Sequence, residues 1–151
     1  MLMPHRKSDP RAVLGFWYLV LVLWFGGFIA VNISILRSQA DDSLIEAFVS
    51  LWKLPEWGPY FIVNCVLASV CTVMIFIGLV YAATGRGLLL GLTVASLLTD
   101  FWKIGLGIDV SSLLKSLSTL ALLPLLTHAY IIYRLVKEAD FFTGGRGQVL
   151  T

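Results

Sequence analysis

The strongest constraint on the fold is a run of 25 residues, Ala12 to Leu36, that contains no charged side chain. About 20 apolar residues are enough for an α-helix to cross the hydrocarbon core of a bilayer, so this run is long enough to span with some tilt. A cleaved secretory signal has a shorter apolar core of about 7–15 residues. The run therefore predicts a membrane-spanning helix that is retained in the protein.

Composition extends this prediction to the whole chain. Of its 151 residues, 58% are hydrophobic and 13% are charged, and the mean hydropathy is +0.88. Soluble domains have about 25% charged residues. We therefore expect an all-α membrane protein in which residues 1–151 form a single integral-membrane domain. The formal net charge of +2 and the lack of a basic run give no indication of nucleic-acid binding.

Further apolar segments follow the first, and together they predict a bundle of four transmembrane helices at residues 12–36, 60–84, 87–108 and 112–136. We expect a tight turn at Thr84–Gly87, because its two glycines adopt positive backbone torsions without strain. Residues 43–54 predict a short amphipathic helix that begins with the capping-box residues Ser43 and Glu46. It is too short to span, so we expect it on the extracytoplasmic side, either as a structural lid or as a docking site for a partner.

The distribution of basic residues predicts the orientation of the chain, because short cytoplasmic loops are enriched in Lys and Arg. Four spans place both termini and the turn at Arg86 on one side of the membrane. That side has seven basic residues and the other has four: Arg6, Lys7, Arg11, Arg86, Arg134, Lys137 and Arg146 against Arg37, Lys53, Lys103 and Lys115. We therefore expect a protein of the cell inner (plasma) membrane with both termini in the cytoplasm.

Small residues recur every four positions on two of the predicted spans. The first row is Gly26, Ala30 and Ser34, and the second is Gly87, Gly91, Ala95 and Thr99, continued by Lys103 and Gly107. Such rows let helix backbones approach one another closely in lipid. We expect the third span to be the innermost helix of the bundle. The rows also favour packing against other membrane subunits or a second copy of the chain.

A set of polar residues lies toward the predicted outer surface: Asp100, Lys103, Asn32, Asn64 and Lys115, with Asp109 nearby. Ionisable side chains in spanning helices almost always face protein or water. One interpretation is an outward-facing polar vestibule around Asp100 and Lys103, as in a small transporter or channel subunit. The other, which we favour, is that Asp100 pairs with Lys103 while the two lysines extend to the membrane interface. Asn32 favours a helix–helix hydrogen bond.

His128 raises the question of haem, which transmembrane histidines ligate in some helical bundles. Bis-histidine ligation needs a second histidine, and the only other one is His5 in the N-terminal arm. We therefore favour a hydrogen-bonded core histidine near Pro124, whose position in the fourth span predicts a kink. We expect the acids toward the outer end and His128 toward the inner end, an arrangement that does not favour a Ser–His–Asp site.

The cysteines give no support to metal or redox chemistry. Cys65 and Cys71 lie six residues apart, on different faces of one helix, and no paired metal-ligand spacing occurs. We therefore predict no cofactor and no metal.

Three features resemble an uncharacterised family of bacterial four-span inner-membrane proteins, the domain of unknown function 2569. They are Gly15-Phe-Trp17 near the start of the first span, the long first loop with its amphipathic segment, and the tail YIIYRLVKEADFF at residues 130–142. Glu138 and Asp140 depart from the more basic tail of that family. The resemblance implies a bacterial inner-membrane setting and implies no activity.

The sequence therefore predicts a non-catalytic multi-pass membrane protein that acts as an accessory, assembly or oligomer-forming subunit through its small-residue helix faces. The alternative is a small transporter or channel subunit. A membrane enzyme or a haem-binding subunit is favoured least. The expected partners are the lipid bilayer and other membrane subunits or further copies of the chain.

Overall fold

The computed structural model describes residues 9–40, 43–54, 58–106, 119–139 and 142, with side chains for all of these except 40, 102–106 and 119–121. The described residues form five α-helices and one short 3-10 helix, and they contain no strand. The elements are α1 (Pro10–Ala40), α2 (Leu44–Lys53), α3 (Gly58–Phe76), η1 (Leu79–Tyr81), α4 (Ala83–Leu106) and α6 (Thr119–Lys137). The prediction of an all-helical chain is confirmed for this part of the protein.

Two of the helices are long and apolar enough to cross a membrane. They are α1 over Pro10–Gln39, with 30 residues and a mean hydropathy of 2.4, and α3 over Gly58–Phe76, with 19 residues and a mean hydropathy of 2.0. Helix α4 has 24 residues and α6 has 19. At 1.5 Å per residue these two helices are about 36 Å and about 28 Å long.

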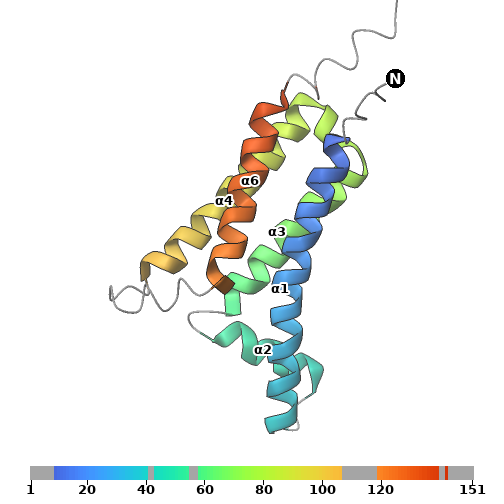
Figure 1. Cartoon of the computed structure of the whole chain (residues 1–151). Coiled ribbons are helices and arrows are strands. Elements are labelled where there is room, and N and C mark those ends of the chain that lie inside the picture. Colours follow the sequence, from blue (N-terminus) through green and yellow to red (C-terminus); the bar gives the residue numbers. More distant parts are fainter. Residues whose placement is uncertain (1–8, 41–42, 55–57, 107–118, 140–141, 143–151) are drawn as a thin grey trace, which may run out of the picture.

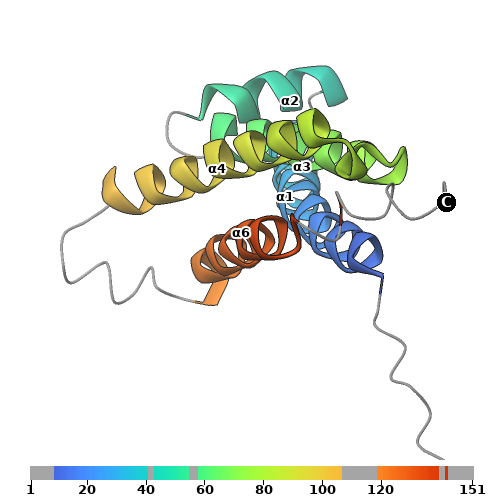
Figure 2. The ribbon, with the colours of Figure 1, turned by 90° about the horizontal axis from the view of Figure 1, so that it is seen from above.

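The four long helices run alternately in opposite directions (Figure 1). The start of α1, the connection from α3 to α4 and the end of α6 lie at one end, and α2 lies beside α1 toward the other end. Helix α1 packs on α3, α3 on α4, α4 on α6, and α6 on α1. The view from above shows α4 beside α3 and facing α6 (Figure 2). The prediction that α4 is innermost is therefore wrong, because each long helix has a neighbour on two sides.

The sequence predicts the turn between α3 and α4 at Thr84–Gly87, and this prediction is wrong because the turn lies earlier in the chain. Helix α3 ends at Phe76, and Gly78 adopts φ +81°, a left-handed conformation that glycine adopts without a side-chain clash. The glycines of the predicted turn belong to α4 instead. A Cβ on Gly85 would lie 2.3 Å from the carbonyl oxygen of Leu79, so this glycine allows α4 to start close against the turn.

Two arginines tie the helix ends together at this end of the molecule. Arg11 donates through Nε to the carbonyl of Ile75 at 3.0 Å and through Nη2 to that of Phe76. Arg86 donates to the carbonyl of Ala139 at 2.8 Å. The last carbonyls of a helix lack partners within the helix and lie at the negative end of its dipole. Arg11 therefore stabilises the C-terminus of α3, and Arg86 holds the chain just after the end of α6.

Helix α2 has the predicted start. Ser43 is its N-cap, and the Ser43 side chain and Glu46 form both hydrogen bonds of the capping box. The helix buries Ala47 and Leu51 and packs on α1 and α3. Pro55, which follows it, lies outside the described residues.

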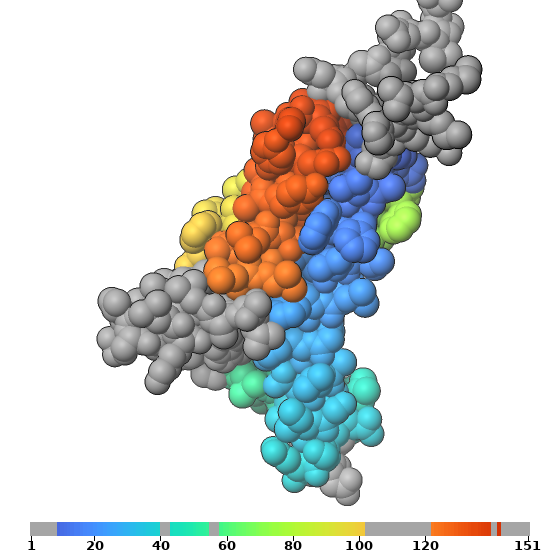
Figure 3. Space-filling model, in the orientation of Figure 1, coloured from blue at the N-terminus to red at the C-terminus, as the bar shows by residue number. Residues whose placement is uncertain are grey.

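The described part of the predicted fourth span is α6, Thr119–Lys137, and Pro124 lies inside this helix. Residues 107–118 lie outside the described part of the chain. Figure 3 shows α6 and α1 side by side along one face, with the C-terminal half of α1 extending beyond α6.

The first three residues of the small-residue row on α4 point away from the other described helices, whereas Thr99 bonds to Asn64 of α3. Gly87, Gly91 and Ala95 are exposed, and no atom lies within 4 Å of the place where a Cβ on either glycine would stand. The first row is divided, since Gly26 approaches Cys65 of α3 while Ala30 and Ser34 are exposed. The buried face of α4 instead carries Leu89, Thr93, Ser96 and Asp100, at helical spacing.

Candidate functional site

Six polar side chains from three helices form one hydrogen-bonded network inside the molecule. We call this set the polar network: Tyr60 and Asn64 of α3, Ser96, Thr99 and Asp100 of α4, and His128 of α6. Four of its members are almost inaccessible, with exposed fractions of 0% for Asn64, 3% for Ser96, 2% for Asp100 and 1% for His128. Buried polar groups are costly unless they are hydrogen-bonded, so the network has to satisfy itself internally.

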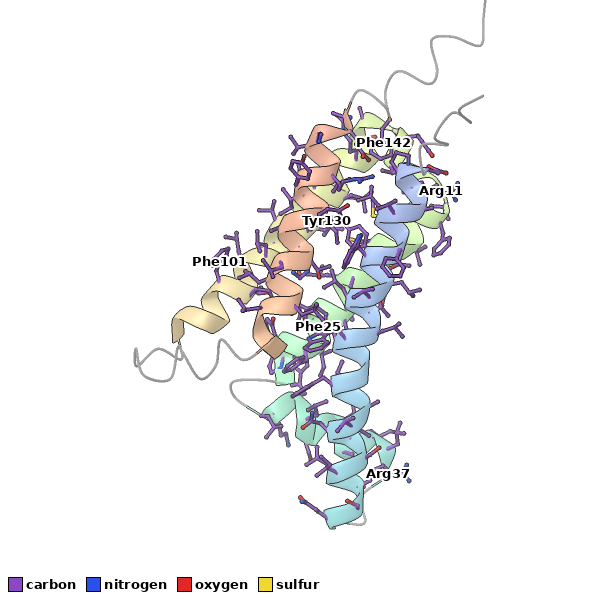
Figure 4. All side chains as sticks on the ribbon, viewed as in Figure 1. Arg11, Phe25, Arg37, Phe101, Tyr130 and Phe142 are labelled. Carbon is purple, nitrogen blue, oxygen red and sulfur yellow. The ribbon has the colours of Figure 1, made fainter. Side chains whose placement is uncertain are left out.

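The centre of the polar network is the contact between Asp100 and His128. Oδ2 of Asp100 lies 2.6 Å from Nδ1 of His128, and Oδ1 accepts a hydrogen bond from the hydroxyl of Tyr60. The imidazole is also stacked on Phe25 of α1, with ring centroids 6.4 Å apart and an angle of 28° between the rings. In Figure 4, Phe25 lies among the helices, whereas Phe101 projects outward from α4. All four long helices therefore surround this pair.

Ser96 and Asn64 form the second half of the polar network. The hydroxyl of Ser96 lies 2.9 Å from Nε2 of His128 and is bonded to the amide oxygen of Asn64. The amide nitrogen of Asn64 donates to the hydroxyl of Thr99 at 3.0 Å and to the carbonyl of Tyr60 at 2.9 Å. The network is therefore continuous from Tyr60 through His128 to Thr99.

The structure brings together three of the residues singled out in the sequence: Asp100, Asn64 and His128. Asn32 is not among them, since its amide donates to the carbonyl of Phe28 within α1 at 2.8 Å. Lys115 and the side chain of Lys103 lie outside the described residues. Both carboxylate oxygens of Asp100 have partners on other helices, so the carboxylate does not depend on Lys103.

The expectation that His128 and the acids lie at opposite ends is wrong. Nδ1 of His128 lies 2.6 Å from Oδ2 of Asp100, so the histidine and this acid are at the same level of the molecule. Depths estimated from sequence also assume that every helix is centred in the membrane, and a displacement of four residues changes the depth by about 6 Å.

Tyr60 and Ser96 are not among the residues selected from the sequence, and Thr99 is placed there only in the small-residue row, although the sequence contains a signal for all three. Thr93, Ser96 and Asp100 follow one another at intervals of three and four residues, and Tyr60 and Asn64 are four apart. Residues at these intervals share a helix face. On α4 the polar row marks the buried face, whereas most of the small-residue row is exposed.

Ser96, His128 and Asp100 have the contact order of a Ser–His–Asp catalytic relay. Reaction at Ser96 would need room for a substrate. The cavity beside Ser96 has a volume of about 10 Å³ and is lined by residues that include Tyr18, Thr93 and His128. A cavity of this size holds about one water molecule. The described residues therefore enclose the relay without leaving space for an acyl substrate.

Haem ligation through His128 also conflicts with its contacts. Both ring nitrogens are within hydrogen-bond distance of a neighbour, Nδ1 of Asp100 and Nε2 of Ser96. An iron atom would have to displace one of these contacts. Among the described residues, no group of three or more His, Cys, Asp and Glu side chains is placed to hold a metal ion.

Outside the helices that line the network, the clearest electrostatic effect is at the start of α2. Hydrogen bonds from the side chain and the backbone of Ser43 lower the pKa of Glu46 below its ordinary value of 4.5. The effect belongs to the capping box and therefore concerns the folding of α2.

Comparisons with protein-family models, curated proteins and solved structures gave no match. The resemblance to the uncharacterised four-span family stays a prediction.

Proposed function

We propose that this chain is a non-catalytic membrane protein that crosses the bilayer four times and associates with other membrane helices as an accessory, assembly or oligomer-forming subunit. The polar network supports the first part of this proposal, because its reactive groups are engaged with one another and enclosed. In such a protein the network locks the helices together, and contacts with partners are made by the outer surface.

The outer surface of the helices supports the membrane assignment. Each long helix presents large apolar side chains that are at least about a third exposed: Phe16, Leu19, Leu23, Phe28, Val31 and Ile35 on α1, Val63, Val66, Val70, Val73 and Phe76 on α3, Leu88, Val94, Leu98 and Phe101 on α4, and Leu123, Leu126, Tyr133 and Val136 on α6. An apolar surface of this extent is unfavourable in water, and large exposed apolar patches mark membrane or partner contacts. We therefore assign all four long helices to the bilayer.

The proposed orientation places both termini in the cytoplasm of a cell with this protein in its inner membrane. Arg11, Arg86, Arg134 and Lys137 all belong to the end of the molecule where α1 starts and α6 ends. This agrees with the enrichment of Lys and Arg on the cytoplasmic side of membrane proteins.

The observation that carries the association is the unoccupied small-residue face of α4. A small-xxx-small row allows close backbone contact between helices in lipid, and Gly87 and Gly91 make no such contact with the described residues of this chain. A helix of another subunit, or α4 of a second copy, fits this face.

Substitution on this face tests the proposal. Gly91→Leu places a bulky side chain on the face, whereas Gly27→Leu makes the same change at an exposed glycine of α1 that is equally free of neighbours within 4 Å. We expect native mass spectrometry in mild detergent to show a larger particle for wild type and for Gly27→Leu, and loss of the partner for Gly91→Leu. A wild-type protein that is monomeric and carries no co-purifying subunit would contradict the proposal. So would a Gly91→Leu variant that associates normally.

A second candidate function is transport, and the buried Asp100–His128 contact favours it. Ionisable residues inside membrane helices often mark proton relays and ion pathways. Asp100→Asn in proteoliposomes tests this candidate. A carrier or channel subunit of this kind would lose ion or substrate flux in the variant, whereas equal flux in the two proteins, or no flux in either, would exclude it.

A further inference from the structure

The hydrogen atoms of the polar network can be assigned from the chemistry of its donors and acceptors, beginning with Asn64. One end of its amide lies 2.9 Å from the carbonyl of Tyr60, which can only accept a hydrogen bond. That end must be the amide nitrogen. The amide oxygen of Asn64 therefore faces Ser96, and it also lies 3.2 Å from the hydroxyl of Thr99.

The orientation of Asn64 determines which way Ser96 donates. An amide oxygen only accepts, and a serine hydroxyl has a single hydrogen. The contact between Ser96 and the amide oxygen of Asn64 therefore uses the hydrogen of Ser96. Toward His128, the Ser96 oxygen can act only as an acceptor. The contact of 2.9 Å between this oxygen and Nε2 then requires a hydrogen on Nε2.

The contact between His128 and Asp100 needs a second hydrogen. Nδ1 and Oδ2 lie 2.6 Å apart, and without a hydrogen between them their lone pairs would repel each other. The pair thus holds one hydrogen on Nε2 and one between Nδ1 and Oδ2. An ionised aspartate and a neutral histidine hold only one between them.

We infer that Asp100 and His128 form a proton-binding site, at which one proton is held between Nδ1 and Oδ2 and the pair has no net charge. The inference does not depend on the proposed association with other helices. A neutral pair suits this position, because an unpaired charge is very costly in an apolar interior. Separation of α4 from α6 would break the contact that holds this proton.

Asn64 acts as a positioning residue for this proton. In the catalytic relay of serine hydrolases the serine donates to Nε2, which is then free of hydrogen. Here Asn64 takes the hydrogen of Ser96 and reverses that bond. The reversal keeps Ser96 inactive as a nucleophile and keeps the extra proton on the pair.

Nitrogen-15 NMR of the full-length protein tests the inference directly. The chain has two histidines, so a His5→Gln background leaves His128 as the single labelled imidazole. We expect Nε2 of His128 to carry a directly bonded hydrogen near neutral pH. If Nε2 carries no hydrogen in this background and the only ring hydrogen is on Nδ1, the inference is wrong.

A matched pair of substitutions tests the role of Asn64. Asn64→Leu removes the acceptor for Ser96, so the Ser96 hydroxyl should turn to His128 and Nε2 should lose its bonded hydrogen. Asn32→Leu makes the same change outside the polar network and should leave the His128 signals as in wild type. Unchanged His128 signals in folded Asn64→Leu would contradict the positioning role, and altered signals in Asn32→Leu would do so as well.

Discussion

The two faces of α4 differ in what they contact. The inner face presents Thr93, Ser96 and Asp100, each hydrogen-bonded to another helix. The outer face presents Gly87 and Gly91, and no atom of the described residues lies within 4 Å of a Cβ placed on either glycine. The comparison indicates that polarity decides which face of this helix is buried, since a buried polar group needs a hydrogen-bond partner and a glycine does not. The inner face holds the fold together, and the outer face is the one that we propose for association.

The largest effect is expected from removing the acid on the inner face. Asp100→Leu leaves Nδ1 of His128 and the hydroxyl of Tyr60 without their partner. Each buried group without a partner costs about 1–3 kcal/mol, so we expect the free energy of unfolding to fall by about 2–6 kcal/mol. Unfolding by denaturing detergent in mixed micelles measures this change. The neighbouring variant Phe101→Leu, at a position 55% exposed, should stay within about 0.5 kcal/mol of wild type. Equal losses in the two variants would show that the face carrying Asp100 is not buried.

A smaller loss is expected at Asn64. Asn64→Leu removes the amide that bonds to Ser96 and Thr99, and we expect a loss of about 1–3 kcal/mol in the same unfolding measurement. Asn32→Leu, which removes a bond within a single helix, should cost less than about 1 kcal/mol. A larger loss for Asn32→Leu than for Asn64→Leu would contradict the assignment of Asn64, and not Asn32, as the amide that joins two helices.

Features that depend on neighbouring residues could be predicted from the sequence, whereas contacts between distant helices could not. The apolar helices α1 and α3 follow from apolar runs, although α3 ends at Phe76, before the predicted end of its run. The start of α2 follows from Ser43 and Glu46, because a capping box depends on neighbouring residues. The contact between Asp100 and His128 does not follow from the sequence. It depends on the stagger of α4 against α6, which in turn depends on where each helix begins.

The position of the α3–α4 turn shows the same limit. Glycines occur at Gly78 and at Gly85 and Gly87, so composition permits a turn at either place. Only the first adopts a positive φ, and the others are helical. The choice depends on packing against Leu79, which local sequence does not reveal.

Alanine substitutions at two glycines should have effects of opposite sign. Gly78→Ala places a side chain in a left-handed conformation and should lower the free energy of unfolding by about 1–2 kcal/mol. Gly87→Ala, on the outer face of α4, should raise it by up to about 1 kcal/mol, because alanine has the higher helix propensity. Unfolding in mixed micelles distinguishes the two signs. A loss of stability in Gly87→Ala would show that the outer face is packed within the chain.

The smallest effect is expected at α2, away from both faces of α4. Its capping box lowers the pKa of Glu46, so this carboxylate stabilises the folded helix above its ordinary pKa of 4.5. The stabilisation is lost as the pH falls through the lowered value in the folded state. Glu46→Gln keeps a capping side chain that does not titrate. We expect the difference in unfolding free energy between wild type and Glu46→Gln to change between pH 7 and pH 3, and a constant difference would contradict the capping role of the carboxylate.

We infer that Asp100 and His128 stabilise the fold as a coupled pair inside the molecule. A double-mutant cycle with Asp100→Leu, His128→Leu and the double variant measures their coupling free energy. Each single change leaves the other residue without a partner, whereas the double change replaces the buried pair by apolar side chains. We predict that the double variant loses less stability than the sum of the two single losses, by about 1–3 kcal/mol. Losses that add within about 0.5 kcal/mol would contradict the account, because they would show that the two side chains do not stabilise each other.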